Sequence, residues 1–378
     1  IGNNAFRNCS LLDLSQVITD ATTYIGSYAF ENCPGISLTK LPDSLITIGD
    51  TPFSGCENVS IVDISNCTQL QSIGSRVFQG MEGIKYLDFS DRTNLQIGSY
   101  AFADCPELGG VKLGGQSVEI DSYAFSNCAK LQEVDFSKCT GSVSFGSYVF
   151  QNTPLQELSI QNASTVSVGK DAFRETQLTR VQLTDITESL TIQSGAFNSC
   201  SQLAFVDFSG STGMKSLLGD LFSGSPALHT VDFSGCTGIT ALPQNLFTSD
   251  CSPVRVDFTG CTGIKELSFS RAYQYAFNGC KRLEELDFTG CTGLEELGSF
   301  LSGCTNLKNI TLPGTEYWIS TLSPFSSCTG LKTITTWFPD EAAADTYGTM
   351  ISRMHSGSAT ERDITLCVYS TDGKIVFS

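Results

Sequence analysis

The sequence predicts a repeat protein, a right-handed solenoid with a parallel β-sheet along one face. A phenylalanine, usually preceded by alanine, returns every 23 to 25 residues, with one interval of 30. A segment of alternating apolar and polar residues follows it. A unit of this size cannot bury its own apolar side, so the units must stack to form a core.

The recurring phenylalanine, called the marker here, defines fourteen repeats, with a leucine in one of its positions. We expect the markers to be buried and stacked, above all Phe125, Phe150 and Phe197. The marker positions are Phe6, Phe30, Phe53, Phe78, Phe102, Phe125, Phe150, Phe173, Phe197, Phe222, Phe247, Phe277, Leu301 and Phe325.

The segment after each marker follows one spacing, seen in Leu131-x-x-Val134-x-Phe136-x-x-Cys139. This is the leucine-rich repeat signature, and its alternation predicts a short half-buried strand. A second strand is expected before the marker, in stretches such as "SVEI" and "LTI". The marker segment itself is short and predicts a tight turn or a 3₁₀ segment. The expected strands include Leu131–Phe136, Leu228–Phe233 and Leu283–Phe288.

The unit "IGSYAFxxCxxLxxVDFSxCT" resembles the BspA-like, or Treponema-type, leucine-rich repeats of bacterial surface proteins. The resemblance covers residues 1 to about 336. It implies a solenoid and a surface location, with adhesion or ligand capture as the role. It carries over no catalytic or binding residue, because the residues of this motif are structural.

Two domains are expected. Residues 1–336 form the solenoid, and residues 337–378 form a C-terminal cap of one helix and a β-hairpin that shields the last open strand. The pattern departs from regularity in the first two repeats and near "SFSRAYQYAF", where the interval of 30 predicts an insertion that bulges from the surface.

Fourteen of the sixteen cysteines occupy two recurring positions, three residues after the marker and at the end of the strand segment. Other repeats place Met81, Thr153 or Ser211 in the same positions. Cysteine therefore behaves as a small buried apolar residue, and we expect reduced thiols, although adjacent repeats lie close enough for an occasional bridge. No CxxC occurs and the chain has two histidines, so neither a metal site nor any cofactor is predicted.

The formal net charge of −17 argues against nucleic acid or an anionic membrane as the main partner. It is compatible with basic partners, divalent cations or simple solubility. No apolar run is long enough to span a bilayer. The first residue, Ile1, already belongs to a repeat, so we expect that a signal or anchor has been removed.

One acidic position recurs in the strand segment, between its two core residues. On an alternating strand this position points outward, which in a curved solenoid is the concave face. Either these carboxylates are simply solvated or a ligand uses them as an acidic column. The residues are Asp63, Asp88, Asp135, Asp207, Asp232, Asp257 and Asp287.

Three functional hypotheses follow. The first is a non-enzymatic, secreted or cell-surface bacterial protein whose concave face binds a protein, possibly a basic one, or a glycan. The second is a structural spacer without a specific ligand. The third is an enzyme that uses acids of the same face, but a catalytic pair should occur once and these acids recur. We expect no enzymatic activity, and the oligomeric state is left open.

Overall fold

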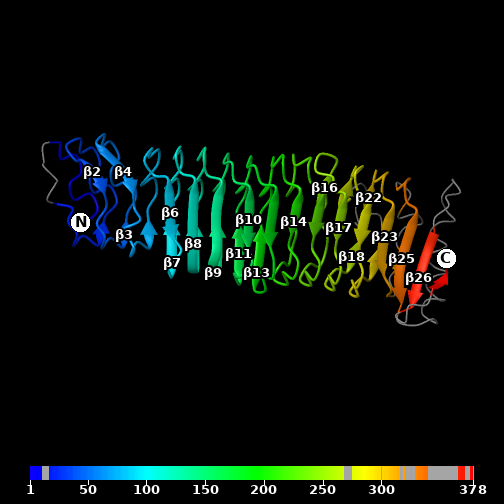
Figure 1. Ribbon diagram of the computed structural model, residues 1–378. Helices are drawn as coiled ribbons and strands as arrows, with labels where there is room; N and C mark the ends of the chain where they lie inside the picture. Colours follow the sequence, from blue (N-terminus) through cyan, green and yellow to red (C-terminus); the bar gives the residue numbers. More distant parts are fainter. Residues whose placement is uncertain are drawn as a thin grey trace. The chain divides into compact units, whose positions relative to one another are not determined.

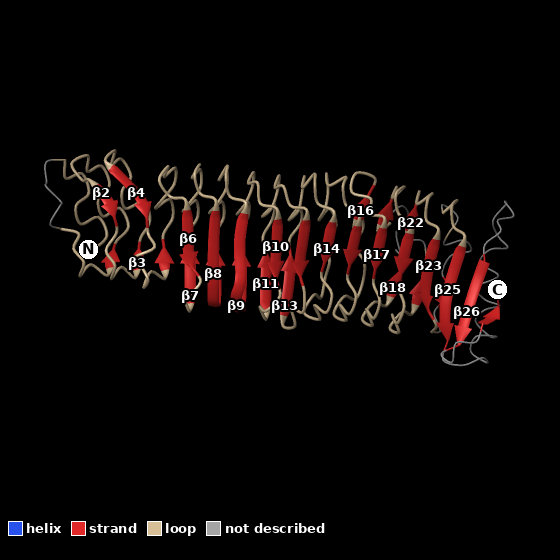
Figure 2. Cartoon of the chain, in the orientation of Figure 1, coloured by secondary structure: helices blue, strands red, loops and turns tan. Residues whose placement is uncertain are grey.

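Each repeat forms one rung of a parallel-strand β-solenoid, so the predicted fold class is confirmed (Figure 1). The computed structural model describes residues 1–10, 17–267, 275–298, 300–315, 318–319, 325, 328–338, 365–370 and 375–377. Within these ranges the chain consists of strands and turns, without a helix (Figure 2). The chain divides into two compact units, Ile1–Leu178 with Gly195–Cys200 and Thr179–Ser194 with Ser201–Ser378, which are described separately.

The first unit has two series of strands per repeat, as the alternating segments before and after the marker predicted. Strands that follow a marker are called first strands here, and strands that precede the next marker are called second strands. The strands of this unit are β1 (Tyr24–Ile25), β2 (Leu38–Lys40), β3 (Thr47–Ile48), β4 (Val59–Asp63), β5 (Ser72–Ile73), β6 (Tyr86–Phe89), β7 (Asn94–Ile97), β8 (Gly110–Ile120), β9 (Glu133–Phe145), β10 (Glu157–Ile160) and β11 (Thr165–Val168).

The second strands of this unit pair in parallel in the order β1-β3-β5-β7-β8-β9-β11. Among the first strands, β6 pairs in parallel with β8, and β8 with β9. Strands β8 and β9 run through both series without a break, so each is longer than the pattern predicted. The expected strand over Leu131–Phe136 is therefore the beginning of β9, which starts two residues later, at Glu133.

The second unit also has a first strand after most markers, but these strands are shorter than β8 and β9 of the first unit. The expected strands over Leu228–Phe233 and Leu283–Phe288 correspond to β15 and β20, each reduced to its central residues. The strands of this unit are β12 (Arg180–Leu183), β13 (Ser189–Ile192), β14 (Phe205–Asp207), β15 (Thr230–Asp232), β16 (Phe247–Thr248), β17 (Arg255–Asp257), β18 (Glu266–Leu267), β19 (Phe277–Asn278), β20 (Glu285–Asp287), β21 (Glu296–Leu297), β22 (Leu301–Ser302), β23 (Asn309–Pro313), β24 (Trp318–Ile319), β25 (Thr333–Phe338), β26 (Thr365–Ser370) and β27 (Ile375–Phe377).

In this unit the first strands form a parallel sheet in the order β12-β14-β15-β17-β20-β23-β25-β26, and β27 joins its end in antiparallel orientation. Two further parallel series are short, β18-β21-β24 and β16-β19-β22. The last of these contains marker positions. The helix expected in the C-terminal cap and most of the expected insertion, residues 268–274, lie outside the described residues.

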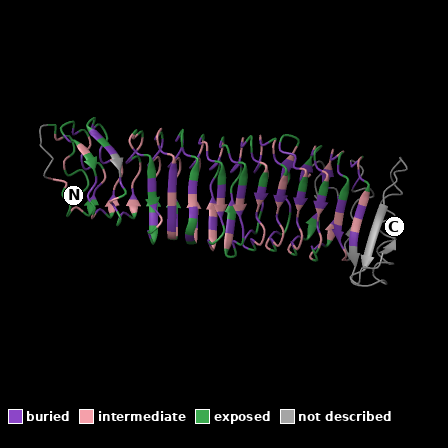
Figure 3. Cartoon of the chain, in the orientation of Figure 1, coloured by how far each residue is buried: buried purple, intermediate pink, exposed green. Residues whose placement is uncertain are grey.

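The core is built from ladders of recurring side chains in the marker segments and the strands. Buried residues occur along most of the described strands (Figure 3). Phe125, Phe150 and Phe197 are 0% exposed, as predicted. In the first unit Phe125 stacks on Phe102 and on Phe150 with ring centroids 5.4 Å apart in both pairs, and Phe197 stacks on Phe173 at 5.6 Å. In the second unit the strand phenylalanines form a further ladder, with Phe233 and Phe258 only 4.9 Å apart.

The cysteines belong to this core, and all described ones except Cys9 are buried. Many of their thiols donate to a main-chain carbonyl one repeat earlier: Cys128 Sγ lies 3.0 Å from the carbonyl oxygen of Phe102, and Cys236 Sγ lies 3.0 Å from that of Phe208. Ser211 replaces a cysteine and donates in the same way to Leu183, at 2.8 Å. A small side chain with a donor thus suits this position, because the carbonyl it meets is buried.

Most marker segments are turns with a left-handed residue on each side of the phenylalanine. In the repeat of Phe125 these are Tyr123, with φ of 61°, and Asn127, with φ of 59°. Asparagine tolerates this conformation, whereas a tyrosine there is uncommon. Stacking compensates for the cost, since the Tyr123 ring lies 4.7 Å from that of Tyr100 and 4.9 Å from that of Tyr148.

Candidate binding face

The outward position of the first strands holds the predicted aspartates, and in the second unit they lie side by side. Asp207, Asp232, Asp257 and Asp287 are register partners on the adjacent strands β14, β15, β17 and β20. These four residues are called the acidic column below. Their side chains are half-buried. Successive carboxylates therefore follow one another at the strand spacing of about 4.8 Å.

Each carboxylate of the acidic column also has a structural partner. Its Oδ1 atom accepts a hydrogen bond from the main-chain N–H two residues later, at 2.7 Å for Asp232 with Ser234 and 2.9 Å for Asp257 with Thr259. The contact gives an acceptor to a main-chain N–H group just beyond the end of the strand. Asp side chains commonly accept such hydrogen bonds in turns. The recurrence of the acid is thus explained by the turn that follows it, and only its outward charge remains for a ligand.

In the first unit the acids are separated. Asp88 and Asp135 lie on β6 and β9, and Lys112 of β8 stands between them in register. The hydrogen bond from the Ser90 main chain holds the pKa of Asp88 below its ordinary value, with smaller help from Lys112. The side chain of Asp63 is outside the described part of the structure. A continuous acidic column is therefore a feature of the second unit.

A second outward column in the second unit carries an exposed aromatic ring. Phe205 of β14 is 44% exposed, at a position where the other strands carry polar residues. The Arg180 guanidinium lies 5.4 Å from its ring centre, and the His229 ring lies 5.9 Å away. Further along, Arg255 pairs with Asp257 at 3.2 Å and with Glu285 at 3.7 Å. The face thus combines aromatic, arginine and carboxylate groups.

The sheet of the first unit carries its own exposed ring, that of Tyr86, which is 47% exposed. Its register partner on β8 is Gly110, and a Cβ atom on that glycine would lie 3.0 Å from Tyr86 Cε2. The glycine therefore leaves the space into which the ring leans. Lys112 Nζ lies 5.9 Å from the ring centre, and the tyrosine hydroxyl raises the pKa of this lysine.

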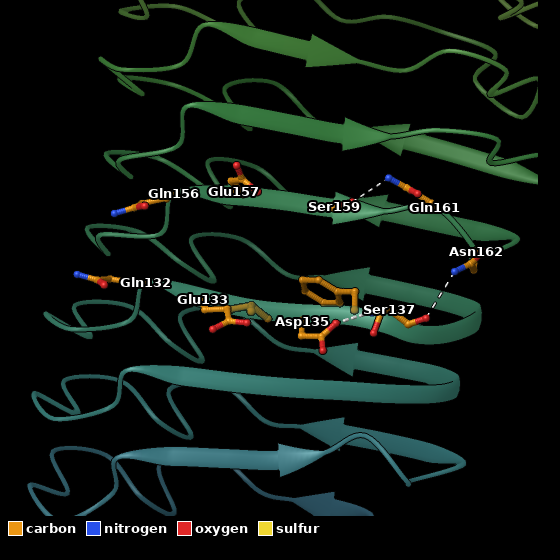
Figure 4. Close-up of a pocket in the computed structure, with 11 residues that line it drawn as sticks. Gln132, Glu133, Asp135, Ser137, Gln156, Glu157, Ser159, Gln161 and Asn162 are labelled. Carbon is orange, nitrogen blue, oxygen red and sulfur yellow. Dashed lines mark hydrogen bonds between the residues drawn. The ribbon is translucent and has the colours of Figure 1, made fainter.

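A depression of about 610 Å3 lies over β9 and β10 of the same unit (Figure 4). Carboxylates, carboxamides and hydroxyls surround it. Gln161 Nε2 donates to Ser159 Oγ at 3.2 Å, and Asn162 Nδ2 donates to the Ser137 carbonyl at 3.5 Å. The lining residues are Gln132, Glu133, Val134, Asp135, Phe136, Ser137, Gln156, Glu157, Ser159, Gln161 and Asn162.

Sequence reasoning found the aspartates but missed Tyr86, Phe205 and this depression. A signal was present for the two rings, since both stand two residues before the recurring acid, in "YLD" and "FVD", where alternation also points outward. The depression had no such signal, because its residues come from two repeats and from the ends of their strands.

We also searched the described residues for a metal site, reactive thiols and a membrane-spanning helix. Within them no three His, Cys, Asp or Glu side chains are grouped so as to hold a metal ion. Burial raises the pKa of the Cys200 thiol to about 11 and that of Cys139 to about 12, which keeps both protonated at neutral pH. The described residues contain no helix that is long and apolar enough to cross a membrane.

Comparison with known proteins gives one clear result. The family model described as "BspA type Leucine rich repeat region (6 copies)" matches residues 1–132, 60–178, 166–272 and 255–341. No curated protein matches the sequence.

Several solved structures are similar. A leucine-rich repeat protein from Bacteroides ovatus is 21% identical, over 97% of this chain and 80% of that one, with a TM-score of 0.43. The Treponema pallidum leucine-rich repeat protein is 28% identical, over 39% of this chain and 67% of that one, with a TM-score of 0.30. A leucine-rich cell surface protein from Faecalibacterium prausnitzii is 18% identical, over 89% and 82%, with a TM-score of 0.30.

Proposed function

Because the chain belongs to the BspA-type leucine-rich repeat family, we propose that it is a non-enzymatic binding protein, secreted or held at a bacterial cell surface. Membership of this family supports a binding role in general. We place the contact with a protein ligand on the outward face of the first-strand sheet of the second unit, formed by β12, β14, β15, β17 and β20.

The exposed ring of Phe205 is the observation that carries this proposal. An aromatic side chain with nearly half its surface in water, on a regular polar sheet, gains free energy when a partner covers it. Arg180 stands next to it, and Arg together with aromatic residues is enriched at the centres of protein interfaces. The acidic column runs beside this pair, which favours a partner with basic side chains.

The spacer hypothesis has one observation in its favour. The Oδ1 atoms of the acidic column are engaged by the main chain, so these acids recur without need of a ligand. The two hypotheses differ in what they predict for Phe205. A spacer gains nothing from an exposed ring there, and Phe205→Ser would change only the contacts of the ring with Arg180 and His229.

Surface plasmon resonance against a panel of purified extracellular proteins tests the proposal. We expect at least one partner whose affinity falls about tenfold or more in Phe205→Ser and in Arg180→Ala, as for residues at the centre of an interface. Leu218→Ser is the matched control, since Leu218 is 42% exposed in the same unit and outside this face. Equal losses for Leu218→Ser and Phe205→Ser, or no partner at all, would favour the spacer.

The contribution of charge can be measured separately. Asn keeps an acceptor oxygen where Asp has Oδ1, so the triple substitution of Asp207, Asp232 and Asp257 by Asn removes charge and preserves the turn contacts. We expect slower association and a weaker dependence on salt, because exposed charges act within about 8 Å at physiological ionic strength. Unchanged kinetics with the same partner would show that the acidic column has no part in binding.

A further inference from the structure

The sheet of the first unit carries a different combination of groups, centred on Tyr86 and the neighbouring depression. Tyr86, Gly110 and Glu133 are successive register partners on β6, β8 and β9. The ring leans over Gly110 towards β9, because a Cβ atom there would lie only 3.0–3.1 Å from two of its carbon atoms. Glu133, the next residue in this row, already lines the depression. The ring and the depression therefore form one continuous surface.

The depression offers many hydrogen-bonding groups beside apolar surface of similar extent. Its two apolar residues, Val134 and Phe136, are 7% and 3% exposed and belong to the core. The exposed groups are the carboxylates of Glu133 and Glu157, the carboxamides of four Gln and Asn residues, and serine hydroxyls. Carboxamides both donate and accept hydrogen bonds, whereas carboxylates accept two or more.

This chemistry selects among ligand classes. An anion would face three carboxylates in the lining, and the nearby lysines are already engaged. Lys112 lies between Asp88 and Asp135, and Lys138 pairs with Asp91. An apolar small molecule would leave the carboxylates and carboxamides of the lining without hydrogen-bond partners. A basic peptide would use the carboxylates but leave the carboxamides without charged partners. A neutral sugar presents hydroxyl groups to both and C–H groups to the tyrosine ring.

We propose that the first unit binds a neutral oligosaccharide across Tyr86 and the β9–β10 depression. The sugar stacks its C–H groups against the electron-rich face of the Tyr86 ring, and its hydroxyls donate to Glu133 and Glu157 and exchange hydrogen bonds with Gln132 and Gln161. From β6 to β10 the surface spans three strand spacings, about 14 Å, the length of a short oligosaccharide. This site is independent of the protein contact proposed for the second unit.

The test uses the whole chain on an array that carries neutral, sialylated and sulfated oligosaccharides, followed by isothermal titration calorimetry with the strongest neutral binder. We expect binding of neutral glycans, with affinity that hardly changes between low and high salt because no ion pair is involved. Tyr86→Ala should weaken this binding about five- to tenfold, the contribution of one aromatic contact. Gln132→Ala and Gln161→Ala should weaken it as well.

Two further variants guard against trivial outcomes. Gly110→Ala keeps the tyrosine but pushes its ring away from β8, and should weaken glycan binding in a chain that melts near the wild-type temperature. Tyr28→Ala is the control, because Tyr28 is 40% exposed in the same unit but lies in a marker turn. It should bind like the wild type, and so should Phe205→Ser.

Three results would overturn the proposal. One is the absence of any neutral glycan on the array that binds at millimolar concentration. Another is binding that Tyr28→Ala weakens as much as Tyr86→Ala. The third is tight, salt-sensitive binding of an arginine-rich decapeptide that is lost in Glu133→Gln together with Glu157→Gln, since that would make the surface a basic-peptide site. None of these results bears on the protein contact at Phe205.

Discussion

The stacking of Phe125 gives the most direct test of how the solenoid is held together. Its ring is 0% exposed and lies between those of Phe102 and Phe150, at 5.4 Å from each and within 5° of parallel. Phe125→Ala removes the ring and leaves a cavity between two aromatic faces. The gap cannot close easily, because main-chain hydrogen bonds of 2.8 Å and 2.9 Å fix the marker turns above and below.

The expected cost is at the upper end of the range for such truncations. Loss of the buried Phe surface contributes about 1.5–3 kcal/mol, and an unrelaxed cavity raises the total for Phe→Ala to about 3–5 kcal/mol. Phe125→Leu keeps most of the buried surface and loses the two ring contacts, so about 1–2 kcal/mol is expected. Phe6→Ala is the matched control, because Phe6 is half-buried and stacks on Phe30 alone among the described rings.

Urea denaturation followed by circular dichroism measures the free energies of unfolding, and hydrogen exchange resolved by peptide shows where the loss occurs. Exchange is needed because a chain with two compact units need not unfold in a single step. Protection should fall most in the repeats next to Phe125, as nearest-neighbour coupling in a repeat protein requires. A loss below about 2 kcal/mol, or equal losses for Phe125→Ala and Phe6→Ala, would refute the ladder as the main source of stability.

Three further predictions concern the turns, the glycines and the thiols. Asp232→Ala leaves the Ser234 N–H without its acceptor and should lower the free energy of unfolding by about 1 kcal/mol, whereas Asp232→Asn should be nearly neutral. Thermal melting of both variants decides whether the fold needs the shape of the aspartate or its charge. Gly74→Ala places a Cβ atom 2.4 Å from the carbonyl carbon of Gly49 and should cost about 1–3 kcal/mol, with Gly2→Ala, which meets nothing within 4 Å, as the silent control. Burial raises the thiol pKa of Cys139 and Cys261 from 9.0 to about 12 in the folded chain, so the unfolded chain loses these protons at lower pH. The free energy of unfolding should therefore fall as the pH rises from 9 to 12, by up to about 1.4 kcal/mol per pH unit for each thiol. Urea midpoints at pH 8 and pH 10 measure this slope, and Cys139→Ala should make it shallower; an identical slope in the variant would show that the thiol does not titrate as burial requires.

Much of the fold could be read from periodicity. The interval of the marker identified the rungs, and alternation in segments such as Val134-x-Phe136 identified the strands and their buried sides. Strand lengths could not be read in the same way. Nothing local distinguishes β9, which continues from Glu133 to Phe145, from β15, which has three residues. Strand length depends on whether the neighbouring repeat continues the pairing, as β8 does along β9 with two register shifts.

The candidate surfaces were predictable only in part. The aspartates were visible because they recur, but their recurrence reflects a turn contact, as the Asp232 and Ser234 pair shows. Tyr86 and Phe205 are the aromatic exceptions at their position, and a search for repetition passes over exceptions. Reading each repeat for the residue that breaks the pattern would have found both.

The sequence by itself determined the repeat, the parallel strands and the residues of the core, because each follows from local alternation and a constant interval. The tertiary structure decided which residues from different repeats meet. Tyr123 adopts a left-handed conformation that its own chemistry disfavours, because stacking on Tyr100 and Tyr148 compensates for the strain. The Tyr86 ring likewise finds its place only because Gly110, 24 positions later in the chain, becomes its neighbour across the sheet. Contacts of this kind depend on register between strands, which no single repeat contains.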